Sequence, residues 1–129
     1  MDIRLRYRSD IVASPIELPS SKSIANRALV INALSEHPAE IGGMSVCDDT
    51  QAIVGALEQV SEHSATIVDI GAAGTAMRFL TAYFAALEGV TVTLTGSQRM
   101  CRRPIALLVD ALRQSGADIA YLGEEGFPP

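Results

Sequence analysis

Basic residues gather at three places in the sequence where helices are predicted to begin. Six of the ten basic residues lie in three short segments: Lys22 and Arg27, then Arg78, then Arg99, Arg102 and Arg103. The stretches around them, 18–35, 70–87 and 89–109, contain no Asp or Glu. The positive end of a helix dipole ordinarily favours acidic residues and disfavours basic ones. Cations beside free backbone N–H groups make physical sense if an external anion binds there, so the sequence predicts a site for small anions.

The first segment is the densest of the three. Its polar residues are spaced i, i+1, i+4 and i+5 and share one face of the first helical turn: Lys22, Ser23, Asn26 and Arg27. Lys supplies a compact charge with three donors, Arg a planar fork that suits two oxygens of a phosphate or carboxylate, and Ser a short hydroxyl donor. This pattern favours recognition of an oxyanion.

The other two segments add small residues and more positive charge. The run GAAGT from Gly71 to Thr75 allows the backbone to approach a ligand closely, and Arg78 lies one turn beyond it. This run matches neither the dinucleotide fingerprint nor a phosphate-binding loop that ends in Gly-Lys-Ser. In the third segment, Arg102 and Arg103 stand directly before Pro104, where a helix is predicted to begin.

Each of these features also has a purely structural interpretation. Ser20 or Ser21 could cap a helix, Arg27 could pair with any carboxylate, and the acidic pair Asp48-Asp49 is interpreted as the cap of its own helix. For one segment the structural interpretation is favoured, but three acid-free basic helix starts in one small chain favour an anion site. The remaining candidates are interpreted as structural: Cys47 and Cys101 as buried thiols, Met77 and Met100 as packing residues, and His37 and His63 as solvated side chains.

A series of alternating helices and strands must position these residues. The hydrophobic pattern and the stop signals predict helices over 22–35, 48–60, 75–88 and 104–115, with Gly89 and Gly116 ending the last two. Strands are predicted over 3–7, 41–46, 65–70, 90–95 and 117–122. The fold class is therefore mixed α/β.

Length and composition restrict the function further. The chain has 129 residues, 48% of them hydrophobic, which suits one compact domain with a buried core. Its net charge of −5 argues against a protein that coats nucleic acid. It has no apolar run long enough for a membrane span, no signal peptide at its start and no Cys or His cluster for a disulfide framework or a metal. The cytoplasm is the predicted location.

At the three segments the sequence resembles the 5-enolpyruvylshikimate-3-phosphate synthase family. The matching motifs are LPSSKSIANRAL from Leu18, GAAGTAMRFLTA from Gly71 and LTGSQRMCRRPIALLVDALRQSGADI from Leu94. The closing YLGEEGFPP also looks like the family's continuation, and the order and approximate spacing agree over the whole chain.

The resemblance implies transfer of the enolpyruvyl group from phosphoenolpyruvate to the 5-hydroxyl of shikimate 3-phosphate, with release of phosphate and without a metal or organic cofactor. The positions that bind phosphoenolpyruvate in the family match Lys22, Gly74 and Arg103. Those that hold shikimate 3-phosphate match Ser23, Arg27 and Thr75, and Lys22 lies near both substrates.

The resemblance also implies a fold of repeated βαβαββ units in two similar domains, of which this chain is an incomplete N-terminal part. Residues 1–18 would belong to the family's lower domain and residues 19–129 to part of the upper one. The acids and bases of the reaction would come from the missing domain. We therefore expect the chain alone to carry half of a binding site and to be inactive.

Three positions depart from the family's pattern: Ser20 stands for Gly, Ala72 for Asn, and Phe79 for the Pro that many members have. These changes bear on the fine geometry of the phosphoenolpyruvate pocket and on the response to glyphosate, which occupies it in the family. Two alternatives stay open. One is the related enolpyruvyl transferase that acts on UDP-N-acetylglucosamine, and the other is an anion-binding module with no catalytic partner.

Overall fold

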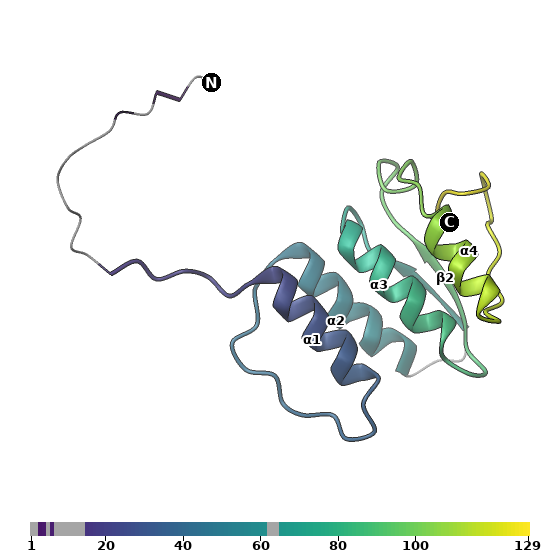
Figure 1. Cartoon of the computed structure of the whole chain (residues 1–129), viewed down its shortest axis with the longest axis horizontal. Coiled ribbons are helices and arrows are strands. Elements are labelled where there is room, and N and C mark those ends of the chain that lie inside the picture. The colour runs from purple at the N-terminus through teal and green to yellow at the C-terminus, as the bar shows by residue number, and fades with distance from the viewer. Residues whose placement is uncertain (1–2, 5, 7–14, 62–64) are drawn as a thin grey trace.

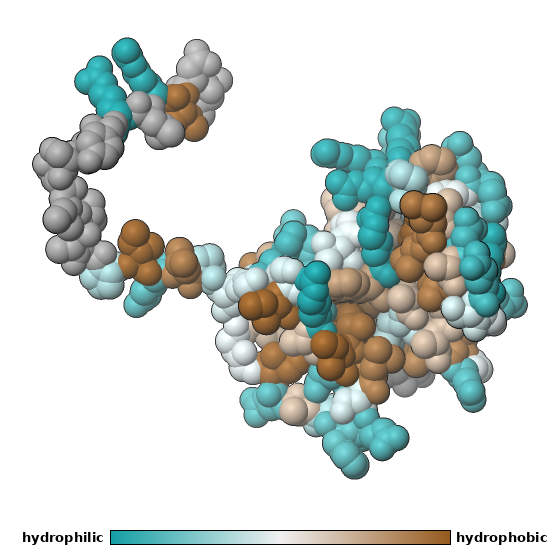
Figure 2. Space-filling model, in the orientation of Figure 1, coloured by the Kyte–Doolittle hydropathy of each residue, from teal (hydrophilic) through white to brown (hydrophobic). Residues whose placement is uncertain are grey.

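The computed structural model describes residues 3–4, 6, 15–61 and 65–129. Within them lie four helices and two strands, in the order α1 (Lys22–Ala33), α2 (Asp48–Ser61), β1 (Ala65–Asp69), α3 (Gly74–Ala85), β2 (Thr91–Thr95) and α4 (Ala106–Gln114) (Figure 1). Residues 15–21, directly before α1, are extended and lead away from the helices (Figure 1). Two hydrophobic side chains of this stretch are exposed, Ile16 at 79% and Leu18 at 82% (Figure 2).

The two strands form a parallel pair that α3 connects. Ala65 is paired with Thr91 at one end and Asp69 with Thr95 at the other. Parallel strands need a crossover connection, and here α3 supplies it. The turn from β1 into α3 passes through Gly71 at φ 57°, a conformation that glycine adopts readily. The amino end of α3 therefore lies at the carboxyl edge of the two strands.

Helices α1, α2 and α3 lie side by side and run in the same direction (Figure 1). Their facing surfaces share one hydrophobic core with the strands and α4. Its most deeply buried side chains come from α2, β1, α3, α4 and the segment before α4: Ile53, Ala56, Val68, Ala76, Met77, Leu80, Met100 and Val109. Because the three helices are parallel, their amino ends lie together on one side of this core.

The local signals at the helix starts explain where the helices begin. The Ser21 hydroxyl caps α1 by accepting a hydrogen bond from the Ile24 N–H at 3.4 Å, which confirms the capping interpretation. No acidic residue lies in the first turn of α1, α3 or α4, whereas α2 begins with Asp48 and Asp49. Neither α3 nor α4 has a capping hydrogen bond from the side chain of its N-cap residue.

Two of the predicted strands are absent from the described residues. Residues 41–46 and 117–122 have no strand pairing, so both predictions were wrong. Strand patterns report a side chain that fits a pleated surface, but a strand forms only where a neighbour supplies the hydrogen bonds. The strand predicted over 3–7 falls partly outside the described residues, and the described Ile3, Arg4 and Arg6 are not in a strand.

The four predicted helices are all present, with shifted ends. The helix predicted from Pro104 begins two residues later at Ala106, and the helix predicted to reach Glu88 ends at Ala85. Both predicted glycine stops have positive φ, 72° at Gly89 and 97° at Gly116. In the described part of the chain, no helix combines the length and hydrophobicity needed to cross a membrane.

Candidate anion-binding site

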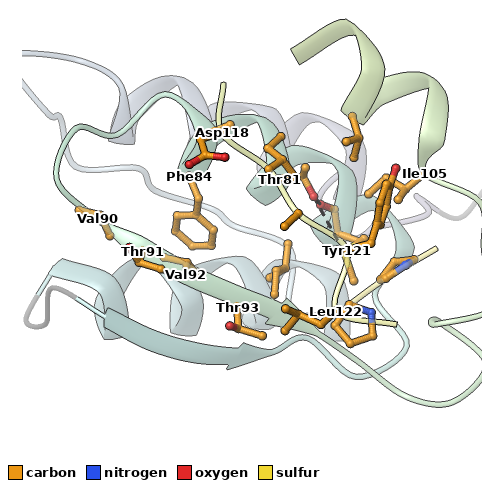
Figure 3. A pocket seen from close by; sticks show the side chains of 18 residues that line it. Thr81, Phe84, Val90, Thr91, Val92, Thr93, Ile105, Asp118, Tyr121 and Leu122 are labelled. Atoms are coloured by element: carbon orange, nitrogen blue, oxygen red, sulfur yellow. Dashed lines mark hydrogen bonds between the residues drawn. The ribbon is translucent and has the colours of Figure 1, made fainter. Parts of the chain in front are cut away.

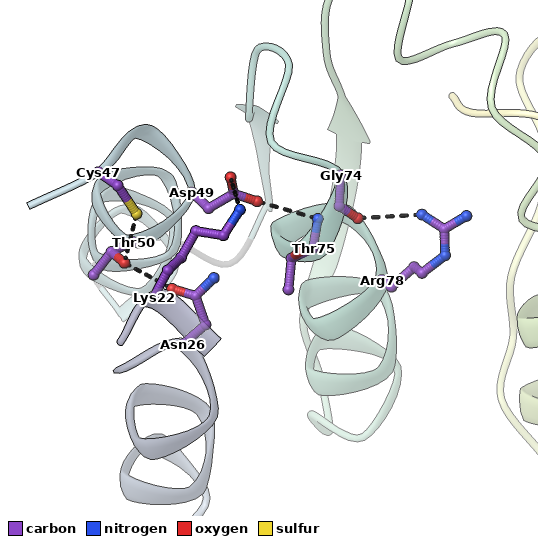
Figure 4. Close-up of polar contacts among 8 residues, drawn as sticks. All are labelled: Lys22, Asn26, Cys47, Asp49, Thr50, Gly74, Thr75 and Arg78. Carbon is purple, nitrogen blue, oxygen red and sulfur yellow. Dashed lines mark hydrogen bonds and ion pairs between the residues drawn. The ribbon is translucent and has the colours of Figure 1, made fainter. Parts of the chain in front are cut away.

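The amino ends of α1, α2 and α3 are joined through the carboxylate of Asp49. Its Oδ2 lies 3.2 Å from the Lys22 Nζ, and its Oδ1 accepts a hydrogen bond of 3.2 Å from the Thr75 N–H (Figure 4). The Lys22 side chain is still 50% exposed, against 17% for Asp49. An ammonium has three donor hydrogens, so Lys22 can hold Asp49 and still donate to a ligand.

Arg103 reaches the same place from the segment before α4. A Cβ built on Gly74 would lie 2.2 Å from the Arg103 Nη1 and 3.4 Å from its Cζ. The guanidinium therefore lies directly over the first residue of α3, in space that any side chain at Gly74 would fill. Arg103 thus lies at Gly74, and Asp49 connects Lys22 to the next residue of α3, Thr75.

Ser23 and Arg27 form a pair on the exposed face of α1. The Arg27 Nη1 donates to the Ser23 carbonyl oxygen at 2.9 Å and to the Ser23 hydroxyl oxygen. The Arg27 Cζ lies 5.5 Å from the centre of the Phe79 ring on α3. All six residues predicted from the sequence therefore belong to one connected group at the helix starts: Lys22, Ser23, Arg27, Gly74, Thr75 and Arg103.

Two of the other residues singled out in the sequence have structural contacts. Arg78 donates to the carbonyl oxygens of Gly74 and Pro104, at 3.2 Å each, so it ties α3 to the segment before α4. Asn26, predicted to share the polar face of α1, is instead fully buried, and its Oδ1 accepts a hydrogen bond from the Thr50 hydroxyl at 2.8 Å. Arg99 and Arg102 are exposed.

A short polar network lies behind the acidic start of α2. The Cys47 Sγ lies 3.2 Å from the Thr50 Oγ1, which in turn bonds to Asn26 (Figure 4). The Thr50 side chain lowers the pKa of the Cys47 thiol from 9.0, because a hydrogen bond to the sulfur favours the thiolate. Cys47 and Cys101 are both free and both partly exposed, so the buried-thiol interpretation was only partly right.

The electrostatics of this arrangement favour an anion. Three parallel helices each place roughly half a positive charge at their amino ends, and Lys22, Arg27 and Arg103 add three full charges. These three side chains are called the cation cluster below. Asp49 offsets only part of this charge, and in the described residues Arg27 and Arg103 have no ion pair with a carboxylate. Like charges that converge in this way are stabilised by a bound polyanion.

A hollow elsewhere in the described residues has a different character. It has a volume of about 400 Å³ and lies between α3, β2, α4 and the last residues of the chain (Figure 3). Its lining is largely hydrophobic and contains no Lys or Arg. Asp118 is the acidic residue in the lining, and the Tyr121 hydroxyl is buried without a hydrogen-bond partner. This apolar groove cannot serve as the anion site.

Asp49 is the site residue that sequence reasoning missed. The sequence assigned the pair Asp48-Asp49 to its own helix, whereas Asp49 contacts the first turns of α1 and α3. One signal could have indicated this role: three helix starts carry no acid, and the fourth carries two. An acidic residue at one helix start can form ion pairs and hydrogen bonds with the basic helix starts beside it.

Comparison with known proteins identifies the family. The model of EPSP synthase (3-phosphoshikimate 1-carboxyvinyltransferase) matches residues 7–129. The chain belongs to the EPSP synthase family. A 3-phosphoshikimate 1-carboxyvinyltransferase of Bacteroides fragilis is 52% identical over 118 residues, which cover 92% of this chain and 28% of that relative. The enzyme of the same name from Bordetella pertussis is 43% identical over 133 residues, covering 88% of this chain and 30% of the relative.

A solved structure shows the same fold. The EPSP synthase from Acinetobacter baumannii superposes with a TM-score of 0.76 at 23% identity, over 88% of this chain and 30% of that one. The prediction of an incomplete, mixed α/β part of the enolpyruvyl transferase fold is confirmed by this likeness. The chain spans less than a third of the length of these EPSP synthase relatives.

Proposed function

We propose that the polypeptide containing this chain is a 3-phosphoshikimate 1-carboxyvinyltransferase. It transfers the enolpyruvyl group of phosphoenolpyruvate to the 5-hydroxyl of shikimate 3-phosphate and releases phosphate. The observation that carries the proposal is the single connected group formed by the six residues that match the family's substrate-binding positions. Family membership supports the choice of reaction.

Each member of the group has a proposed role. Lys22, Gly74 and Arg103 bind phosphoenolpyruvate, with the bare Gly74 backbone leaving room for the Arg103 guanidinium above it. Ser23, Arg27 and Thr75 hold shikimate 3-phosphate. Lys22 lies at the junction of the two groups and serves both substrates.

The chemistry explains why cations dominate the site. Both substrates are polyanions, and two such molecules repel each other at reacting distance. The cation cluster offsets this repulsion, so that proximity and orientation can lower the barrier. Protonation of the enolpyruvyl C3, attack of the hydroxyl on C2 and loss of phosphate need positioned acids and bases. We infer that another part of the complete polypeptide supplies those groups.

The proposed domain organisation follows from the same reasoning. Residues 1–18 belong to the domain that faces the site, and residues 19–129 form part of the domain that carries the helix starts. The exposed Ile16 and Leu18 are available for contact with such a facing domain. We place the enzyme in the cytoplasm, and we expect no turnover by residues 1–129 alone.

A phosphate-release assay on the complete polypeptide tests the proposal. We expect release only when shikimate 3-phosphate and phosphoenolpyruvate are both present. Residues 1–129 alone serve as the control that is expected to be inactive. Phosphate release with UDP-N-acetylglucosamine in place of shikimate 3-phosphate would assign the chain to the other enolpyruvyl transferase. No release with either acceptor would contradict the proposed activity.

A further inference from the structure

Arg27 is held against an aromatic ring rather than against a carboxylate. Its Cζ lies 5.5 Å from the centre of the Phe79 ring, a distance at which a guanidinium over a ring face is attracted to it. Phe79 is half-buried on α3, and Arg27 is exposed on α1. The contact therefore joins two helices whose amino ends form the candidate site.

The hydrogen bonds of Arg27 leave part of the guanidinium open. Those within the described residues use Nη1, which donates to the Ser23 carbonyl and hydroxyl oxygens. A guanidinium has five N–H donors in a planar fork, so the edge formed by Nη2 and Nε is available to a ligand. The ring and Ser23 thus fix the plane of the fork while its outer edge can bind two oxygens of a phosphate.

The two cations on α1 are held by different kinds of partner. Asp49 holds Lys22 through a carboxylate, which cancels part of the charge that a ligand would meet. A phenyl ring carries no formal charge, so Phe79 orients Arg27 and leaves its full positive charge for the ligand. This difference is useful for a side chain that must bind an anionic group of a ligand.

We propose that Phe79 is a positioning residue for the oxyanion-binding Arg27. It holds the guanidinium in its binding orientation before the ligand arrives, and so reduces the ordering cost of binding. The inference rests on the proposed function, because it takes an anionic group of shikimate 3-phosphate, its carboxylate or its phosphate, as the ligand of Arg27. Phe79 and Thr75 are one turn apart on α3, so the same helix face orients Arg27 and contributes Thr75 to the site.

A titration of the complete polypeptide with shikimate 3-phosphate tests this role, using three variants. Phe79→Leu keeps a similar hydrophobic volume but removes the ring, and we expect the dissociation constant to rise about 3- to 10-fold. Phe79→Tyr keeps the ring face and is expected to bind within about 2-fold of the unchanged chain. Tyr83→Leu removes a ring one turn further along α3 as the matched control, and its affinity is expected to stay within about 2-fold.

The Arg27 Nε–H resonance separates positioning from general stability. In the unchanged chain the Phe79 ring current shifts this resonance, and the shift is expected to disappear in Phe79→Leu and to persist in Phe79→Tyr and Tyr83→Leu. Because this signal is measured without ligand, it tests the stacking contact in the unchanged chain even if Phe79→Leu fails to fold. An Nε–H resonance without a ring-current shift would overturn the proposal.

The binding outcomes distinguish the two claims. If the unchanged chain and Phe79→Leu bind shikimate 3-phosphate equally, or if Tyr83→Leu loses as much affinity as Phe79→Leu, the positioning role is wrong and the proposed function stands. If the unchanged chain and Arg27→Ala bind shikimate 3-phosphate equally, Arg27 is not in the site. In that case the substrate assignment fails and the role of Phe79 fails with it.

Discussion

A methyl group added at Gly74 is expected to displace Arg103 while leaving the fold intact. In Gly74→Ala the new Cβ would lie 2.2 Å from the Arg103 Nη1, closer than the 3.0 Å below which real Cβ contacts are essentially never found. The guanidinium must therefore move by about 0.8 Å or more. Because it is the exposed end of a flexible side chain, it can do so without disturbing the core.

The magnitudes for stability and binding differ sharply. Replacing glycine by alanine in the first turn of a helix changes stability by about 1 kcal/mol or less, in the stabilising direction. Loss of one charge-assisted hydrogen bond from Arg103 to phosphoenolpyruvate costs about 1.5–3 kcal/mol of binding free energy. This corresponds to a rise of about 10- to 100-fold in the dissociation constant.

Thermal unfolding and NMR titrations of residues 1–129 with each substrate measure both effects. Gly55→Ala is the matched control, because nothing lies within 4 Å of a Cβ built at Gly55 in α2. We expect Gly74→Ala to weaken phosphoenolpyruvate binding and to leave shikimate 3-phosphate binding within about 2-fold. Unchanged phosphoenolpyruvate affinity would refute the placement of Arg103 over Gly74 in the site, as would an equal loss of affinity in Gly55→Ala.

Three further predictions concern stability and pH. Asp49→Ala removes the acceptor of the Thr75 N–H and the partner of Lys22. We expect the free energy of unfolding to fall by about 1–2 kcal/mol, a value that includes only a small contribution from the ion pair because Lys22 is half exposed. An unchanged free energy of unfolding in chemical denaturation would contradict this prediction. Tyr121→Phe removes a buried hydroxyl that has no partner and whose pKa burial raises, so stability is expected to rise by up to about 1 kcal/mol in the same assay, and a loss would show that the hydroxyl is hydrogen-bonded. The hydrogen bond from Thr50 lowers the pKa of Cys47 in the folded state below the ordinary value of 9.0. The native state therefore gains stability from this group as pH rises from the lowered pKa to 9.0, and it loses that stability as pH falls back through the lowered pKa. Thr50→Val is expected to raise the pKa of Cys47 and to slow its alkylation by iodoacetamide at neutral pH, measured with Cys101 replaced by serine. Identical curves of alkylation rate against pH with and without Thr50→Val would rule out the Thr50 contribution.

The helices were the most predictable part of the fold because their signals are local. Ser21 caps α1, the Asp48-Asp49 pair opens α2, and Gly89 and Gly116 stop the chain after α3 and α4, each acting within a few residues. The segments 41–46 and 117–122 have strand-like patterns but no partner strand. Whether a neighbour is present depends on distant parts of the chain, so the pattern alone could not decide it.

The sequence predicted which basic residues lie at the helix starts, but not the contacts that they make. The absence of acidic residues around Lys22, Arg27 and Arg103 predicted a ligand-binding role, and in the structure these residues contact the first turns of α1 and α3. The pairings themselves join residues far apart in sequence, such as Asp49 with Thr75 and Arg27 with Phe79. The parallel packing of α1, α2 and α3 brings these side chains together. The spacing of residues along the sequence does not predict how the helices pack, so these contacts could not be predicted.

The most direct test of the account is a backbone amide NMR map of residues 1–129 titrated with shikimate 3-phosphate. The account predicts saturable shifts at the amino ends of α1 and α3, centred on Ser23, Arg27 and Thr75. It predicts none in the apolar groove around Tyr121 and Leu122. Shifts confined to that groove, or no saturable shift at the helix starts, would contradict the central claim that the cation cluster is a substrate site.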